Sequence, residues 1–131
     1  MINLSITGLY VSLLALLFIG LSINIIRLRL QLKVGIGDGE QPSLAKAIRV
    51  HGNFAEYVPL AFLLLGCYEI NGGSDLWLHL LGATIFIGRV LHAMGLTKTI
   101  GTSIQRQVGM LSLFLVIIIL SIENIRLFLL S

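Results

Sequence analysis

Charged residues are scarce in this sequence, and their scarcity defines the class of protein. Of 131 residues only 11% are charged, whereas 56% are hydrophobic. A soluble domain has about 25% charged residues, and a chain this short leaves a large share of its surface in contact with solvent. A soluble fold could not bury so much apolar surface, so we predict a single membrane domain spanning residues 1–131.

Cysteine and amino-terminal basic residues are also lacking. Cys67 is the single cysteine, which excludes an internal disulfide, and its apolar surroundings favour a packing role. No Lys or Arg precedes the first apolar run and no small-residue cleavage pattern follows it, so a retained span is expected rather than a signal peptide. The net charge of +3 is modest, and the basic residues adjoin apolar runs. This pattern indicates membrane topology or an anionic ligand, with no nucleic-acid partner.

Long apolar runs predict four helices, because a bilayer span needs about 20 apolar residues. The expected spans are residues 4–29, 43–70, 75–94 and 104–129. A Gly-rich stretch over residues 35–42, a turn at 71–73 and a loop over 95–102 separate them. Ser74 and Ser103 are the expected N-caps of the third and fourth helices. The predicted fold class is an all-α integral membrane four-helix bundle.

Basic residues cluster around two of the three connections. They are Arg27, Arg29, Lys33, Lys46 and Arg49 at the first, and Arg89, Lys98 and Arg106 at the third. The second turn has none and is flanked by Glu69 and Asp75. The positive-inside rule places the first and third connections in the cytoplasm, and both termini on the non-cytoplasmic side. Arg126 is the one contrary charge.

The second helix carries a polar stripe. Arg49, Asn53 and Glu56 fall at i, i+4 and i+7, which puts a cation, an amide and a carboxylate on one side of a helix. Such groups are costly in hydrocarbon and normally face a bundle interior or a wet cavity. Pro59 follows one turn later and leaves the carbonyl of Ala55 without its usual donor.

Other helix ends add polar groups at the same level of the membrane. Arg89 and His92 end the third helix, Arg106 opens the fourth between two glutamines, and Arg27 lies near the end of the first. Because both cytoplasmic connections are short, these ends should meet. The sequence therefore predicts a site rich in arginine with one carboxylate, Glu56.

Each of these residues also has a purely structural interpretation. Basic side chains at helix ends commonly extend to lipid headgroups, an interpretation favoured for Arg29, Lys33, Lys46 and Lys98. For Arg27 and Arg106 the two interpretations are equal, and Arg49 with Glu56 could be a structural ion pair.

The histidines give weaker indications. His51 and His92 are more often satisfied hydrogen-bonding groups than ligands or bases, and the sequence assigns His79 no partner. No ligand spacing such as H-E-x-x-H is present, so no metal site is expected.

Taken together, these elements resemble the MAPEG superfamily, the membrane-associated proteins in eicosanoid and glutathione metabolism. The chain is most similar to its small bacterial branch, which resembles microsomal glutathione transferase. The resemblance rests on Arg49-x-x-x-Asn53-x-x-Glu56-x-x-Pro59, on Gly88-Arg89-Val90-x-His92, on Arg27-Leu28-Arg29 and on Arg106.

The resemblance implies a homotrimer in the bacterial inner membrane, with glutathione bound between subunits near the cytoplasmic face. The implied glutathione-binding residues are Arg27, Arg49, Asn53, Glu56, Arg89 and His92. Arginine forks suit the two carboxylates of glutathione, and Glu56 suits its ammonium. Arg106 is the candidate catalytic residue, because a nearby cation favours the thiolate. The implied reaction is attack on a hydrophobic electrophile dissolved in membrane lipids, or reduction of a lipid hydroperoxide.

The chain departs from some family members, and another class of function competes. Gln107 stands where some members have serine, Leu96 and Met110 where some have tyrosine, and Gly52 where several have arginine. These changes count against prostaglandin-type isomerase chemistry. The alternative is a small membrane transporter or a lipid- or anion-binding protein. Compact exporters are expected to carry an acidic residue in the first span, and this first span has none.

Overall fold

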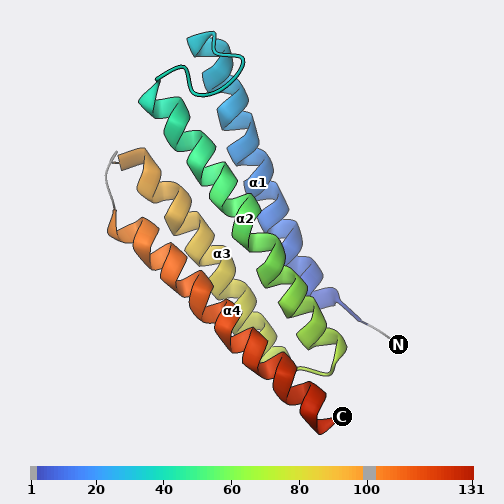
Figure 1. Ribbon diagram of the computed structural model, residues 1–131. Coiled ribbons are helices and arrows are strands. Elements are labelled where there is room, and N and C mark those ends of the chain that lie inside the picture. Colours follow the sequence, from blue (N-terminus) through green and yellow to red (C-terminus); the bar gives the residue numbers. More distant parts are fainter. Residues whose placement is uncertain (1–2, 99–102) are drawn as a thin grey trace.

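The computed structural model of the protein describes residues 3–98 and 103–131, leaving aside the side chains of 96–98. Its helices are α1 (Ser5–Leu32), α2 (Pro42–Ile70), α3 (Asp75–Lys98) and α4 (Ile104–Leu130). They run alternately up and down an elongated bundle, and both termini lie at one end of it (Figure 1). The predicted all-α four-helix bundle is confirmed, while the side of the membrane on which the termini lie stays a prediction.

Three of the helices are long and apolar enough to cross a membrane within the described residues. They are Ser5–Leu32, Asp75–Gly95 and Ile104–Leu130. α2 is as long as the others but does not qualify, because Lys46, Arg49, Asn53 and Glu56 dilute its amino-terminal half. It nevertheless lies along the bundle and contacts α1, α3 and α4. Neighbouring helices therefore shelter the polar half of α2 from lipid on part of its surface.

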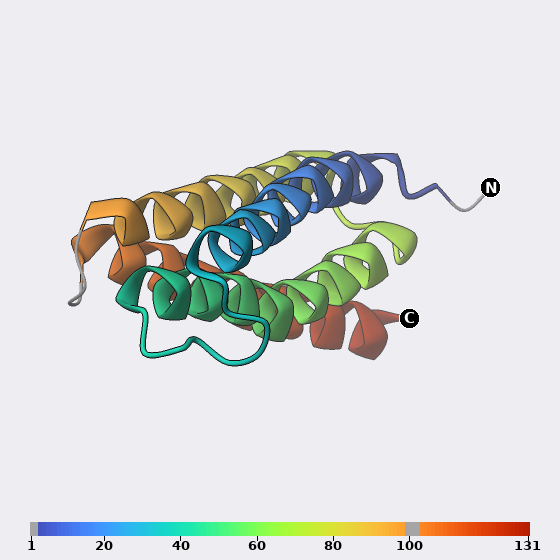
Figure 2. The same ribbon diagram turned by 90° about the horizontal axis from the view of Figure 1, so that it is seen from above.

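The packing of the helices gives the bundle a rhombic cross-section. α2 and α3 touch across its short diagonal, whereas α1 and α4, both fully described, do not touch each other. Seen from above, α1 lies with α3 on one side and α2 with α4 on the other (Figure 2). Leu65, Leu78, Ile85, Leu113 and Leu120 are fully buried between the helices.

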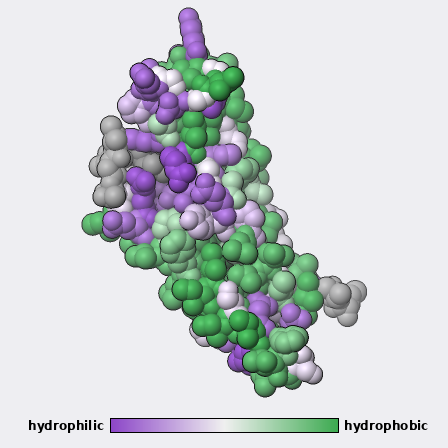
Figure 3. All heavy atoms as spheres, viewed as in Figure 1, coloured by the Kyte–Doolittle hydropathy of each residue, from purple (hydrophilic) through white to green (hydrophobic). Residues whose placement is uncertain are grey.

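The outer surface of α1 and α4 is apolar. Leu16, Ile23 and Leu30 are exposed along α1, as are Leu115 and Ile122 along α4. Figure 3 shows hydrophobic residues over much of the bundle, with hydrophilic residues gathered mainly toward the end where α1 ends and α4 begins. Exposed apolar rows of this kind suit contact with lipid tails.

Some ends of the helices follow local sequence signals. α2 begins at Pro42, which suits the first helical position. Ser103 is the N-cap of α4, as predicted, because its hydroxyl accepts a hydrogen bond from the Arg106 N–H at 3.3 Å. α3 continues through Gly95 to Lys98 instead of ending at residue 94. A Cβ at Gly95 would lie 2.5 Å from the Ser103 hydroxyl, so this glycine permits close contact with α4. Residues 99–102 of the predicted loop lie outside the described residues.

Candidate functional site

A polar cavity of about 440 Å³ lies between α2, α3 and the beginning of α4. It is lined by Asn53 from α2, His92 from α3, and Ser103, Arg106, Gln107 and Met110 from the start of α4. Its lining residues belong to the end of the bundle where hydrophilic residues gather (Figure 3). Three of the residues predicted from the sequence, Asn53, His92 and Arg106, therefore meet around one space.

Two glycines bring α3 and α4 into direct contact beside this cavity. A Cβ at Gly109 would lie 2.5 Å from the carbonyl oxygen of Gly88 and 2.9 Å from Cβ of His92. A Cβ at Gly88 would lie 2.6 Å from the Ser112 hydroxyl. Small residues allow membrane helices to approach at their backbones. This approach places the last turns of α3, with Arg89 and His92, against the first turns of α4.

Arg89 is a buried cation without an anionic partner. Its side chain is 1% exposed, and within the described ranges no carboxylate pairs with it. Its Nη2 lies 3.0 Å from His92 Nδ1, its Nη1 lies 3.7 Å from the sulfur of Met110, and its guanidinium carbon lies 5.7 Å from the centre of the Phe54 ring. Its Nε has no hydrogen-bond partner. Buried charges are normally paired, so an uncompensated positive charge lies directly behind His92 and Met110, two residues that line the cavity.

The contact with Arg89 fixes the hydrogen on the His92 ring. A guanidinium has only donors, so Nδ1 of His92 must accept and cannot carry a proton. His92 is therefore neutral, with its proton on Nε2. Because His92 lines the cavity, this arrangement makes it a hydrogen-bond donor toward a bound molecule rather than a general base.

Asn53 supplies a hydrogen-bond acceptor, in contrast to the donor on His92. Its side chain is 8% exposed, and its amide oxygen has no hydrogen-bond partner. A buried polar atom without a partner carries a desolvation cost. A ligand that donates an N–H or O–H group to Asn53 would remove that cost, so the cavity offers an acceptor on α2 and a donor on α3.

Arg49 and Glu56 occupy the outer face of α2 rather than the cavity lining. Arg49 Nη1 lies 3.6 Å from Glu56 Oε1, and the two side chains are 67% and 54% exposed. The predicted stripe therefore divides, with Asn53 turned into the bundle and the two charges at its edge. Their ion pair is the structural alternative that the sequence left open, and it leaves both groups accessible to a ligand.

Arg27 lies in a different place. Its Nη2 donates to Asn24 at 3.1 Å, and both residues line a second cavity between α1, α2 and α3. The two cavities share no lining residue. Within one subunit, Arg27 is therefore not brought together with Asn53, His92 and Arg106.

The remaining histidines have structural partners. His51 Nε2 lies 3.0 Å from the Ser22 hydroxyl, and its ring stacks on Phe18 with centroids 4.4 Å apart. His79 Nδ1 lies 3.1 Å from the Tyr10 hydroxyl, a pairing across α1 and α3 that no local pattern indicates. Both serve contacts between helices.

The sequence prediction did not include Ser103, Gln107, Met110 or Leu111 among the site residues, although Gln107 and Met110 stand where some family members carry serine and tyrosine. At the start of α4, the spacing i, i+4 and i+7 puts Ser103, Gln107 and Met110 on one face of the helix. The same periodicity that indicated the stripe on α2 would have found them.

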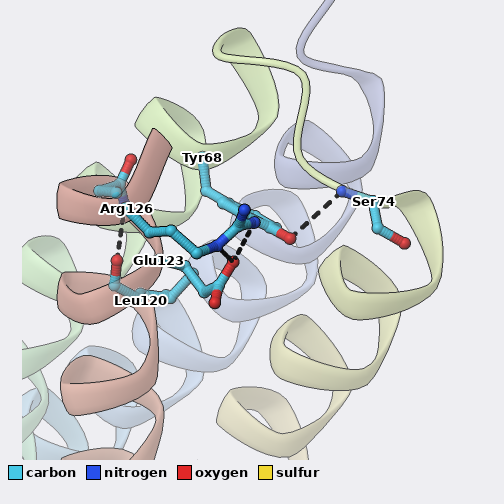
Figure 4. A network of polar contacts seen from close by, with 6 residues as sticks. Tyr68, Ser74, Leu120, Glu123 and Arg126 are labelled. Carbon is cyan, nitrogen blue, oxygen red and sulfur yellow. Dashed lines mark hydrogen bonds and ion pairs between the residues drawn. The ribbon is translucent and has the colours of Figure 1, made fainter. Parts of the chain in front are cut away.

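The other end of the bundle uses its acidic groups differently. The Glu69 carboxylate accepts hydrogen bonds from the backbone N–H groups of Ile6 at 3.0 Å and Thr7 at 2.7 Å, and so caps the start of α1. Figure 4 shows the Tyr68 hydroxyl beside the Ser74 backbone N–H, a bond of 3.3 Å, and Arg126 paired with Glu123 at 2.8 Å. Glu69 and Tyr68 join the end of α2 to the starts of α1 and α3, whereas the pair of Glu123 and Arg126 lies within α4.

The fold and the cavity define a class of protein: an all-α membrane protein with a pocket at one end of a four-helix bundle, lined by Asn53, His92 and Arg106 and backed by the buried Arg89. The chain belongs to the MAPEG family, whose model matches residues 7–126. The family inferred from sequence motifs is thereby confirmed.

Two curated relatives are similar to the chain. The "Inner membrane protein YecN" of Escherichia coli strain K12 is 34% identical over 90 residues, which cover 69% of each chain. The protein of the same name from Escherichia coli O6:H1 strain CFT073 shows the same identity and coverage. No solved structure matches the chain.

Proposed function

We propose that the protein is a glutathione transferase of the bacterial inner membrane, acting in detoxification. The observation that carries this proposal is Arg89, a buried cation without a carboxylate beside a cavity that also holds an unpartnered amide oxygen. An anionic ligand with N–H donors would neutralise the charge of Arg89 and give the Asn53 oxygen a hydrogen bond. Glutathione has two carboxylates, amide N–H groups, an ammonium and a thiol, so its chemistry fits this set. Membership of the MAPEG family supports the choice.

Residues in and around the cavity each have a role in this proposal. Arg49 and Arg89 attract the carboxylates, Asn53 accepts from an N–H group, His92 donates from Nε2, and Glu56 receives the ammonium. Glu56 and Arg49 exchange their mutual ion pair for these contacts. Charge-assisted hydrogen bonds of this kind are stronger than neutral ones.

Arg106 is the proposed catalytic residue. It lines the cavity, and a guanidinium near the thiol lowers the free energy of the thiolate, which is the nucleophile. The thiolate sulfur attacks an electrophilic carbon, a C–S bond forms, and the leaving group departs with the electron pair of the bond that breaks. The thiol proton passes to solvent. With a lipid hydroperoxide, the sulfur attacks the O–O bond instead, and a second glutathione reduces the resulting sulfenic acid, giving glutathione disulfide, water and the lipid alcohol.

The position of Arg27 bears on assembly. It could reach glutathione in the cavity only if a neighbouring subunit brought its own α1 against the α2–α4 side. Such an arrangement is part of the proposed homotrimer. The site would face the cytoplasm, because the end of the bundle that contains it also carries most of the Lys and Arg residues.

A titration of detergent-purified protein with glutathione tests the proposal. A ligand that binds only the folded state raises stability with its concentration, by about 2.7 kcal/mol at 100 times its Kd. The expected result is a thermal unfolding midpoint that rises over the millimolar range, together with turnover of a chlorinated aromatic electrophile. Absence of any shift at millimolar glutathione would rule out the proposal. A shift without turnover of the electrophile or of a lipid hydroperoxide would reduce the protein to a glutathione-binding module.

A further inference from the structure

The cavity that contains Arg27 is the larger of the two at this end of the bundle. It measures about 570 Å³ and lies between α1, α2 and α3. Its polar lining consists of Asn24, Arg27, Ser43 and Lys46, and its other walls are largely apolar, with Leu21 and Val50 among them. No acidic side chain belongs to this lining.

Positive charge reaches this cavity from two helices. Arg27 comes from α1 and the half-buried Lys46 from α2, and within the described residues neither forms an ion pair. Ser43 lies in the first turn of α2, where backbone N–H groups lack partners within the helix and the helix dipole is positive. The carboxylate of Asp38 in the preceding loop is turned to the Glu40 N–H, at 3.0 Å. These groups together favour an anion.

The apolar walls indicate what kind of anion fits. A small inorganic ion would leave Leu21 and Val50 in contact with water, whereas a lipid would place hydrocarbon against them. The cavity lies at the end of the bundle, next to the exposed apolar row of α1 that includes Ile23 and Leu30. Basic pockets between membrane helices at the cytoplasmic face are known to bind anionic headgroups.

We infer that this cavity is a binding site for an anionic phospholipid. The phosphodiester lies between Arg27 and Lys46, with Asn24 and Ser43 as hydrogen-bond donors, and an acyl chain follows the apolar wall. The inference does not depend on glutathione, because the two cavities share no lining residue. It assigns Arg27 to a lipid in its own subunit, in place of the contact with a neighbouring subunit's glutathione that the proposed homotrimer would give it.

The test is native mass spectrometry of the full-length protein with added phosphatidylglycerol, in the absence of glutathione. Phosphatidylcholine with the same acyl chains is the lipid control. Arg27→Ala and Lys46→Ala should each weaken phosphatidylglycerol binding about fivefold, because each basic residue near a membrane surface contributes about 1 kcal/mol. Lys33→Ala is the matched control, since Lys33 is exposed at the same end but lies outside the cavity. Lys46→Arg should restore binding.

Four results would overturn the inference. Equal binding of the two lipids would show that the headgroup charge is not recognised. Equal loss in Lys33→Ala and Lys46→Ala would reduce the effect to general surface charge. Full displacement of phosphatidylglycerol by an equal concentration of inorganic phosphate would assign the site to a free anion. Weaker glutathione affinity in Arg27→Ala, with unchanged lipid binding, would assign Arg27 to glutathione alone.

Discussion

The two ends of the bundle treat charge in opposite ways. At the end that holds both termini, Glu69 caps α1 and Glu123 pairs with Arg126. At the other end, Arg89 is buried without an anion, and the Asn53 amide oxygen has no donor. Glu69, Glu123 and Arg126 at the first end are held by contacts within the protein, although Thr7 Oγ1 and Asn124 Oδ1 are buried there without a hydrogen-bond partner. The second end differs because it buries a whole charge, that of Arg89, without an anion, and this difference indicates a binding site rather than a structural contact.

The largest expected effect is on catalysis, and it compares two arginines of the same helix. Arg106→Ala should lower turnover of a chlorinated aromatic electrophile about 100-fold, because it removes a preorganised charge at the reacting sulfur. Arg126→Ala, at the opposite end of α4, should leave turnover unchanged. The measurement is kcat/KM for both variants at saturating glutathione. Equal losses would show that Arg106 acts through the fold rather than at the thiol.

The next largest effect is on glutathione binding by Arg89→Met. Comparing it with the effect on stability distinguishes a ligand-binding arginine from a structural one. Arg89→Met keeps the length of the side chain and removes the buried charge. Replacement of a buried charge by an apolar group is often neutral or stabilising, so the unfolding midpoint without glutathione should stay the same or rise. Glutathione affinity should fall about thirtyfold, since loss of one partner of a buried charge pair costs about 2 kcal/mol or more. Thermal unfolding with and without glutathione measures both.

The opposite pattern would contradict this view of Arg89. If Arg89→Met unfolded at a much lower temperature and kept the full shift with glutathione, the arginine would be a structural member of the α3–α4 contact. Arg126→Met serves as the control, because it removes an exposed arginine at the other end of the bundle.

The smallest effect concerns the terminal end. Glu69→Ala removes the carboxylate that caps α1 and should lower stability by about 1 kcal/mol, as loss of a helix cap does. Glutathione affinity should not change, because Glu69 caps the start of α1, whereas the cavity lies at the start of α4, and these two helix ends are at opposite ends of the bundle (Figure 1). Glu123→Ala removes an exposed ion pair and should have a much smaller effect on stability. A change of glutathione affinity in Glu69→Ala would mean that the two ends are coupled.

Sequence patterns predicted the architecture well, because apolar run length and local capping residues carry it. They also predicted that Asn53, His92 and Arg106 would meet, since short connections bring helix ends to one level. They could not predict which residues of the stripe on α2 line the cavity and which lie outside it. Helical spacing shows that Arg49, Asn53 and Glu56 share a side, but how far each lies from the bundle axis depends on the neighbouring helices.

Local sequence patterns could not predict contacts between segments that are far apart in the sequence. The continuation of α3 through Gly95 depends on the fit of that glycine against α4. The bond between Glu69 and the start of α1 joins residues more than sixty positions apart, and the pairing of Tyr10 with His79 is of the same kind. The separation of Arg27 from the other predicted residues depends on the rotation of α1 about its own axis, which no sequence pattern specifies.

The contact between Gly88 and Gly109 has a further consequence for how the site tolerates change. The spacing between His92 and Arg106 is held by two main chains that touch, rather than by side chains that can adopt other rotamers. Substitutions elsewhere in the apolar core can therefore accumulate without moving these residues apart. A single methyl group at Gly109 would push α3 and α4 apart. His92 on α3 and Arg106 on α4 would then move apart with their helices.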